Sequence, residues 1–219
     1  YIVLHIILGV FLYKESKSTF VGGGVLFLVC LLFLTYSRGS FLAFLTILGM
    51  YAIFFKKKLL AVLGATIFFA VLLMLPRSFG EGVRLERTST IVARFQNWSD
   101  AGSLFLQSPL FGVGFNTYRY RRGGEEIVSE YPDLAGGGVD NSYLFILVTS
   151  GIFGLVSYIY LWYFLARFSM KVYRDFLIFP VLGALGVHAF FTNTLFYPWN
   201  MIWLWIIVGV SVEKEVNRT

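Results

Sequence analysis

The sequence predicts an all-α membrane protein: a polytopic bundle of transmembrane helices with one large extracytoplasmic loop that contains short interfacial helices. Hydrophobic residues make up 58% of the 219-residue chain and charged residues only 14%, whereas about a quarter of residues are charged in soluble domains. Apolar runs of transmembrane length recur, without the alternating pattern of a membrane β-barrel. One long polar passage, residues 77–141, interrupts these runs.

Seven apolar runs approach or reach the length of a transmembrane helix, which needs about 17 to 25 residues. The first four are assigned to a segment 1–76, residues 77–141 form the extracytoplasmic active-site loop, and the last three runs and a cytoplasmic tail form the segment 142–219. The chain begins without a methionine or a signal peptide, so we expect it to be part of a longer protein. The predicted spans are Tyr1–Tyr13, Phe20–Tyr36, Ser40–Phe55, Leu59–Pro76, Ser142–Leu165, Phe176–Phe191 and Leu195–Val212.

Basic residues in the connecting loops predict the orientation, because they are retained on the cytoplasmic side. If the spans alternate in direction, one side carries ten basic and four acidic residues, among them all seven lysines. The other side carries eight arginines, eight acidic residues and no lysine. We therefore expect the loop on the outer face. Its arginines could bind phosphate through paired hydrogen bonds, or could simply tolerate an interfacial position well.

Arg38 lies in a short polar break, Thr35–Ser40, between two apolar runs. A charge with almost no loop around it is held at the membrane surface, where its energetic cost is lowest and it can still face the helix bundle. This position favours a functional role. The alternative is a plain interfacial anchor at a helical turn, with Gly39 providing the bend.

Arg94 borders the apolar face of a segment that resembles a helix lying along the membrane surface. On such a helix Arg94 and Trp98 are one turn apart. A purely structural amphipathic cover would show the same pattern. The residues of the apolar face are Ile91, Phe95, Trp98 and Phe105.

Asp140 and Asn141 open the fifth predicted span after three glycines. Aspartate and asparagine are preferred helix N-caps, so Asp140 could simply bind free backbone N–H groups. A carboxylate at the membrane face, near arginines, could instead act as a general base or orient a substrate hydroxyl group. The sequence leaves these three roles open.

Four motifs, in this order, resemble the O-antigen ligase and polymerase family. They are Ser37-Arg38-Gly39, Arg94-x3-Trp98-x2-Ala101, the Pro-Leu-Phe-Gly-Val-Gly run from Pro109 to Gly114, and Asp140-Asn141 followed by Gly151-x-x-Gly154. The long loop and the flanking spans also agree with this family. The resemblance covers Leu26 to Leu165 and implies the C-terminal portion of a larger membrane protein.

The resemblance implies a glycosyltransferase of the bacterial inner membrane that uses no metal or other cofactor and acts on the periplasmic or extracellular face. Its donor would be a glycan linked to undecaprenyl diphosphate and its acceptor a glycan or glycolipid, in lipopolysaccharide or exopolysaccharide biosynthesis. Contact with the lipid bilayer is expected, and binding of nucleic acid is not. Arg38 and Arg94 match arginines that hold the diphosphate in the family's ligases, whereas Asp140 stands where those ligases have a histidine. The choice between ligase and polymerase therefore stays open.

We predict Asp140, Arg38 and Arg94 as catalytic residues, with the two arginines also binding substrate. Further substrate-binding residues are expected in and beside the loop. They are Asn141, Trp98, Arg87 and Tyr118.

Two other classes of protein share this membrane scaffold. A flippase or transporter of lipid-linked glycans would also use outer arginines, but it would typically contain broken helices or repeated halves, which the sequence does not show. A non-catalytic subunit of a polysaccharide assembly system would not account for the placement of Arg38, Arg94 and Asp140.

Overall fold

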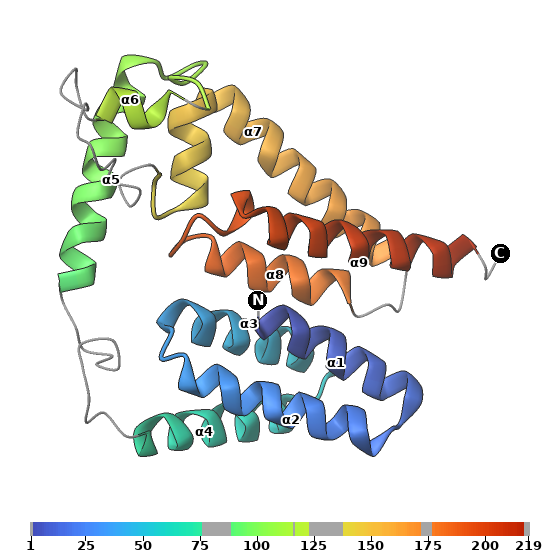
Figure 1. Ribbon diagram of the computed structural model, residues 1–219. Helices are drawn as coiled ribbons and strands as arrows, with labels where there is room; N and C mark the ends of the chain where they lie inside the picture. The colour runs from blue at the N-terminus through green and yellow to red at the C-terminus, as the bar shows by residue number, and fades with distance from the viewer. Residues whose placement is uncertain (1, 76–88, 116, 123–137, 172–176, 217–219) are drawn as a thin grey trace. The chain divides into compact units, whose positions relative to one another are not determined.

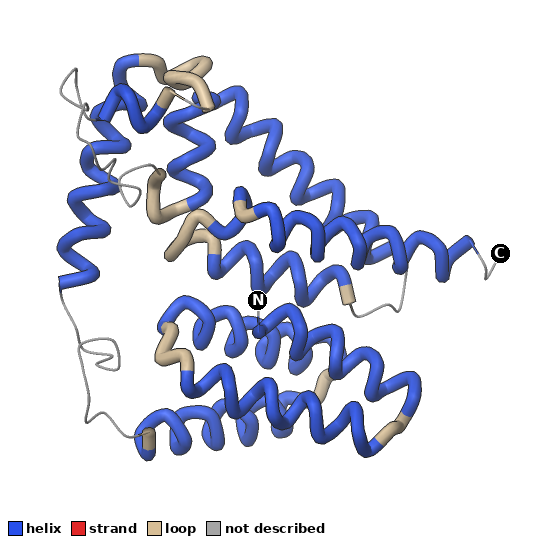
Figure 2. Tube along the Cα trace, viewed as in Figure 1, coloured by secondary structure: helices blue, strands red, loops and turns tan. Residues whose placement is uncertain are grey.

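The computed structural model describes residues 2–75, 89–115, 117–122, 138–171 and 177–216 (Figures 1 and 2). Every regular element in these ranges is a helix, which confirms the predicted all-α class. The chain divides into two compact units. The first unit consists of Tyr1–Glu86, Phe168–His188 and Trp199–Thr219, and the second consists of Arg87–Arg167 and Ala189–Pro198.

The helices of the first unit follow the predicted apolar runs, with bounds that differ by four residues or fewer. They are α1 (Ile2–Ser16), α2 (Thr19–Leu34), α3 (Arg38–Phe55), α4 (Lys58–Met74), α8 (Ile178–His188) and α9 (Pro198–Val216). Helix α1 packs against α2, and α3 packs against both α4 and α8. Figure 1 shows α1 and α2 running side by side.

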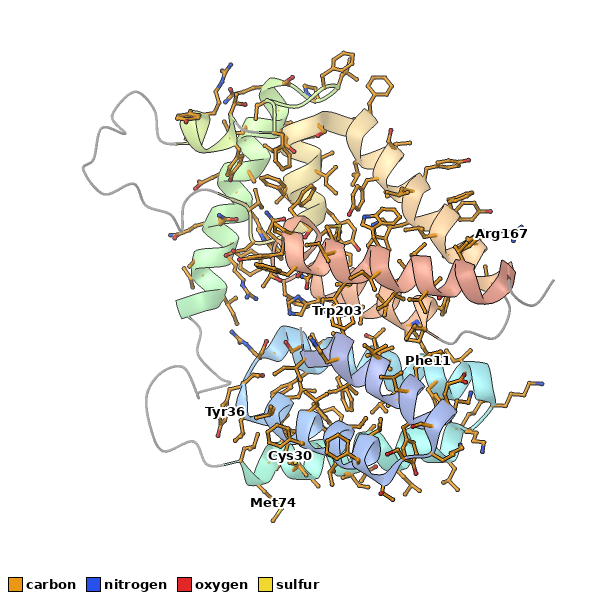
Figure 3. The ribbon with its side chains drawn as sticks, turned by 45° about the vertical axis from the view of Figure 1, so that its right-hand side comes forward. Phe11, Cys30, Tyr36, Met74, Arg167 and Trp203 are labelled. Carbon is orange, nitrogen blue, oxygen red and sulfur yellow. The ribbon has the colours of Figure 1, made fainter. Side chains whose placement is uncertain are left out.

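The polar break around Arg38 is a tight turn between α2 and α3. The bend is not at Gly39, which lies in the first turn of α3. It is at Tyr36, whose φ of 48° places this residue in the left-handed region, and Figure 3 labels Tyr36 at this turn. The Ser37 hydroxyl oxygen accepts a hydrogen bond from the Ser40 N–H at 3.3 Å and caps α3. Arg38 is therefore the first residue of a capped helix.

Aromatic rings and one glycine join the helices of the first unit. Phe68 of α4 is 3% exposed, and the centre of its ring lies 5.0 Å from that of Phe33 in α2 and 5.5 Å from that of Phe41 in α3. Such ring pairs add about 0.5 to 1.5 kcal/mol beyond the burial of their area. Between α3 and α8, a Cβ atom at Gly183 would lie 2.3 Å from the Met50 sulfur. Glycine thus permits the close approach of these two helices.

The second unit is built on three helices and a short 3-10 helix. They are α5 (Ser89–Gln107), α6 (Tyr118–Arg122), most of α7 (Ser142–Lys171) and η4 (Thr194–Phe196). Side chains from α5, α6, α7 and the residue before Asp140 meet in one buried cluster. Its members are Ala101, Leu104, Tyr118, Val139, Phe145 and Val148.

Helix α7 is broken at Gly151, where φ is 68° and ψ is −167°. Figure 1 shows the bend between its yellow and orange halves. The predicted span Ser142–Leu165 is thus not one continuous helix. The first half is largely buried in the unit, whereas the second half is rich in exposed apolar side chains, a surface suited to lipid. That second half has about 20 residues and a length of about 30 Å, enough by itself for the hydrocarbon core of a bilayer.

By length and composition, one helix of the described residues, Ser142–Met170, is long and apolar enough to cross a membrane. The other apolar helices in the described part have 10 to 17 residues within their apolar stretches. These stretches are Thr19–Leu34, Arg38–Ile53, Val62–Met74, Ile178–His188 and Pro198–Val212.

The segment Pro109–Gly114 replaces the hydrogen bonds that α7 loses at Gly151. In a continuous helix, the N–H groups of residues 152 and 153 would reach the carbonyl groups of residues 148 and 149. Here all four groups pair with the backbone of residues 109–114 instead. The bonds run from Ile152 N–H to Pro109 O (2.9 Å), from Phe153 N–H to Leu110 O (3.4 Å), from Val113 N–H to Val148 O (2.8 Å) and from Gly114 N–H to Thr149 O (2.9 Å). We call this arrangement the α7 splice. The α7 splice gives a physical reason why the motif from Pro109 to Gly114 and the motif Gly151-x-x-Gly154 occur together.

Candidate functional site

The predicted site residues divide between the two units. Arg38, the first residue of α3, belongs to the first unit. Arg87 lies outside the described residues. The others belong to the second unit: Arg94 and Trp98 on α5, Tyr118 at the start of α6, and Asp140 and Asn141 just before α7.

A buried asparagine connects α5 to the backbone beside Asp140. The side-chain amide of Asn97 donates a hydrogen bond from Nδ2 to the carbonyl oxygen of Gly138 at 3.1 Å. Its Oδ1 accepts a hydrogen bond from the backbone N–H of Asp140 at 3.0 Å. Asn97 is only 6% exposed, so its side chain is largely shielded from competing water. We call this pair of bonds the Asn97 bracket.

The Asn97 bracket places Asp140 in the neighbourhood of Arg94. Residues three apart on a helix are surface neighbours, with about 5 to 6 Å between their Cβ atoms. Arg94 stands in this relation to Asn97 on α5, and its side chain is half-buried. Two of the three predicted catalytic residues therefore come from the same region of the second unit.

Asn141, and not Asp140, provides the N-cap of α7. Its Oδ1 accepts hydrogen bonds from the backbone N–H groups of Tyr143 at 3.0 Å and Leu144 at 3.1 Å. The side chain of Asp140 is exposed, and its carboxylate accepts no hydrogen bond from any described residue. The structure therefore gives the capping role to Asn141, and the Asp140 carboxylate is not needed to cap α7.

The start of α7 is also fixed by Ser142, which is fully buried. Its backbone N–H donates to the carbonyl oxygen of Ala189 at 2.8 Å. Its hydroxyl donates to the carbonyl oxygen of Thr192 at 3.1 Å and accepts from the Leu195 N–H at 3.2 Å. Asp140 thus precedes a helix end that is tied to residues distant in the sequence.

Substitutions at the two adjacent positions should separate capping from catalysis. Replacing Asn141 with alanine is expected to lower the free energy of unfolding by about 1 kcal/mol, because two helix N–H groups lose their acceptor. Replacing Asp140 with alanine should change stability by less than about 0.5 kcal/mol, as is usual for exposed positions. Thermal unfolding of the purified protein in detergent measures both. Equal losses at the two positions would contradict the assignment of the cap to Asn141.

Trp98 combines a packing role with an unused polar group. Its side chain is partly buried against the cluster of the second unit, and the centre of its ring lies 5.7 Å from that of Phe95. Among the described residues its indole Nε1, although buried, finds no hydrogen-bond acceptor. The predicted apolar face is split, because Phe95 is 63% exposed while Trp98 and Phe105 pack inward.

Tyr118 lies in the core of the second unit. It is 1% exposed, and its ring meets that of Phe145 edge to face, with 6.1 Å between their centres. Protein atoms of the described structure cover this ring, and the predicted contact of Tyr118 with substrate stays a prediction. The burial of Tyr118 favours a packing role.

Arg38 combines a side-chain charge with a helix N-terminus. The first backbone N–H groups of a helix lack partners within the helix and favour an anion nearby. The Ser37 hydroxyl occupies one of them, that of Ser40. A cation is unfavourable for helix stability at this end of a helix, and the Arg38 side chain is half-buried there.

Asn97 is the functional candidate that the sequence did not reveal. It occupies an unspecified position of the Arg94-x3-Trp98 motif, and only its burial on an otherwise apolar side of α5 distinguishes it.

For metals, no group of three or more histidine, cysteine, aspartate or glutamate side chains among the described residues is placed to hold an ion.

Comparison with known proteins agrees with the motifs. The family model described as O-antigen ligase matches residues 23–159, well over half of the chain. The match includes Arg38, Arg94, Asp140 and both backbone segments that pair in the α7 splice. No curated protein and no solved structure matches the chain. The family is associated with membranes and carries out glycan transfer of the ligase or polymerase type. The chain belongs to the O-antigen ligase family.

Proposed function

We propose that this chain is a membrane glycosyltransferase that transfers or polymerises a glycan from an undecaprenyl-diphosphate-linked donor onto a sugar hydroxyl group at the outer membrane face. One observation carries the proposal. The Asn97 bracket ties Asp140 to the helix that bears Arg94, while the Asp140 carboxylate stays exposed and Asn141 performs the capping. Stability alone does not require a carboxylate at this position.

The proposed reaction needs a base and a group that stabilises a diphosphate. The acceptor hydroxyl oxygen forms a bond to the anomeric carbon of the donor sugar, and the bond from this carbon to the diphosphate oxygen breaks with its electron pair. Asp140 accepts the hydroxyl proton or orients the hydroxyl group by a hydrogen bond. Arg94 and Arg38 stabilise the negative charge that grows on the leaving diphosphate.

The other predicted residues take supporting roles in this proposal. Asn141 fixes the start of α7 beside Asp140. Trp98, on α5, packs against the buried cluster that includes Val139, the residue before Asp140. Arg87 remains a proposed contact to the substrate. Arg38 is proposed as a second contact to the diphosphate, on the ground of its match to the family motif and its position at the start of α3.

We also propose the multi-pass topology and its sidedness. The segment 1–76 would contribute four spans and 142–219 three spans and a cytoplasmic tail, in the bacterial inner membrane. The segment 77–141 would face the periplasm or the extracellular side. The lysines support this orientation, because all seven fall on the opposite side, and basic residues are retained in the cytoplasm. The exposed apolar surface of α7 after Gly151 supports its contact with lipid.

Helix α7 is broken at Gly151. Broken helices also occur in transporters, where they expose backbone groups to a substrate or an ion. In this chain the four backbone groups released at the break are all bound by the segment Pro109–Gly114. They are therefore not available to a ligand. The α7 splice stabilises the unit and gives no support to a transporter function.

Release of undecaprenyl diphosphate from a lipid-linked oligosaccharide tests the proposal directly. The full-length protein would be purified and incubated with donor, with and without an acceptor glycan, beside its Asp140→Asn variant. We expect release that depends on the acceptor, falls by about 100-fold or more in the variant and is unchanged by EDTA, since we propose that the reaction uses no metal.

The outcomes separate the competing functions. Absence of release with every acceptor tested, together with translocation of the donor in vesicles, would replace the proposal with a flippase. Release that persists in Asp140→Asn would leave glycan transfer in place but remove Asp140 from the catalytic residues. Inhibition by EDTA would show that a metal takes part.

A further inference from the structure

We propose that Asn97 is a positioning residue, which holds Asp140 in the orientation required for glycan transfer. This inference rests on the proposed function and adds to it a residue at an unspecified position of the Arg94-x3-Trp98 motif. The starting observation is that both polar atoms of one buried side chain bind the backbone on the two sides of Val139, at Gly138 and at Asp140.

The bracket determines how the short segment before α7 is oriented. Because the carbonyl group of Gly138 and the N–H group of Asp140 both point to Asn97, the peptide groups around Val139 are fixed. Val139 itself is 1% exposed and belongs to the buried cluster. On the other side of Asp140, Asn141 is fixed by capping α7. Both neighbours of Asp140 and its own N–H group are therefore held, while its side chain alone faces outward.

Such an arrangement suits a catalytic group better than a packing residue. A catalytic carboxylate must be held close to its productive geometry by residues whose own positions are locked. A displacement of about 1 Å can lower a rate by about 100-fold. Asn97 also joins the backbone of Asp140 to α5, the helix that carries Arg94. Among the described residues, Asn97 is the one whose side chain accepts a hydrogen bond from the backbone N–H of Asp140.

A double-mutant cycle distinguishes positioning from a structural role. Asn97→Ala would be measured in the wild-type background and in the Asp140→Asn background, with Ser99→Ala, an exposed position on the same helix, as the matched control. We expect Asn97→Ala to lower kcat by about 10- to 100-fold with the donor KM changed by less than about twofold. In the Asp140→Asn background the same substitution should lower kcat by less than about twofold, because the group that it positions is already gone.

Hydrogen exchange provides a readout that does not depend on activity. In the wild-type protein the backbone N–H of Asp140 should exchange slowly, and Asn97→Ala should accelerate exchange in peptides that cover residues 138–141 by about tenfold or more. Ser99→Ala should leave exchange unchanged. If the wild-type protein shows no glycan transfer, the proposed function fails, while the exchange experiment still decides whether the bracket holds Asp140.

Three results would overturn the inference. The first is an equal loss of kcat from Asn97→Ala in both backgrounds, which would indicate a general structural role. The second is a loss of activity that follows a loss of thermal stability, with Asp140 exchange unchanged. The third is wild-type kcat in Asn97→Ala.

Discussion

Replacement of Arg94 with alanine is expected to lower the rate of glycan transfer by about 100- to 1,000-fold, the usual effect of removing one donor that stabilises a developing charge. Arg94 is half-buried on α5, and among the described residues it is not part of the buried cluster of the second unit. Its removal should therefore leave the fold intact. Release of undecaprenyl diphosphate under saturating donor measures the rate, and the melting temperature in detergent reports the fold.

Two further variants define the role of the charge. Arg94→Lys keeps a positive charge but cannot bind a phosphate group through two parallel hydrogen bonds, so its rate should fall between those of wild type and Arg94→Ala. Arg167→Ala removes the same charge from an exposed position near the C-terminal end of α7 (Figure 3) and should retain wild-type activity. Equal losses in Arg94→Ala and Arg167→Ala would indicate a general electrostatic effect instead of a binding site.

Arg38 offers a way to ask whether the two arginines hold the same diphosphate. They belong to different units, and their proposed cooperation rests on the family motifs. If both contact one leaving group, the effects of Arg38→Ala and Arg94→Ala on the rate should not add in the double variant. Full additivity would place the two side chains on separate parts of the substrate.

The helices were largely predictable from the sequence, because long apolar runs between basic turns have few alternatives in a membrane protein. The turn at Tyr36 was not, since Gly39 offered a better candidate for a left-handed conformation. Ser37 determines where α3 begins. Its hydroxyl caps α3 at Ser40, so the helix begins before Gly39 and the bend falls one residue earlier than the cap.

The candidate site was predictable only in part, because motif positions do not reveal which neighbour performs which task. Asp140 and Asn141 are equally good caps by residue type, and the hydrogen bonds of Asn141 settle which one caps α7. Tyr118 is a residue type that can stack on a sugar ring, but its side chain is buried in the core of the second unit. Asn97 could not be singled out, since its importance depends on contacts with residues more than forty positions away.

The break in α7 shows most clearly what periodicity cannot predict. The sequence around Gly151 is apolar enough for an uninterrupted span, and only its pairing with a distant segment permits the break. Without the carbonyl and N–H groups of residues 109–114, the four unpaired backbone groups would be costly in an apolar environment. The two glycine-containing motifs thus depend on each other physically.

Replacing Gly151 with alanine is expected to destabilise the protein by about 3 kcal/mol or more. Its φ of 68° and ψ of −167° belong to a region that is essentially restricted to glycine. An added Cβ atom would also lie 2.1 Å from the carbonyl oxygen of Leu110, a backbone atom that cannot move without breaking the α7 splice. Thermal unfolding in detergent measures the loss. As a control, Gly102→Ala on α5 meets no atom within 4 Å and should preserve or slightly raise stability.

The same reasoning predicts how Gly151 and Gly112 interact. Gly112 has a φ of 72°, and a Cβ atom there would lie 2.3 Å from the carbonyl carbon of Thr149, so Gly112→Ala alone should also be strongly destabilising. Both added atoms would push apart the same two segments of backbone. Once the first substitution has separated them, the second meets less resistance, and the double variant should lose less stability than the sum of the single variants. A melting temperature near that of wild type in either single variant would show that the splice does not hold α7 in its broken form.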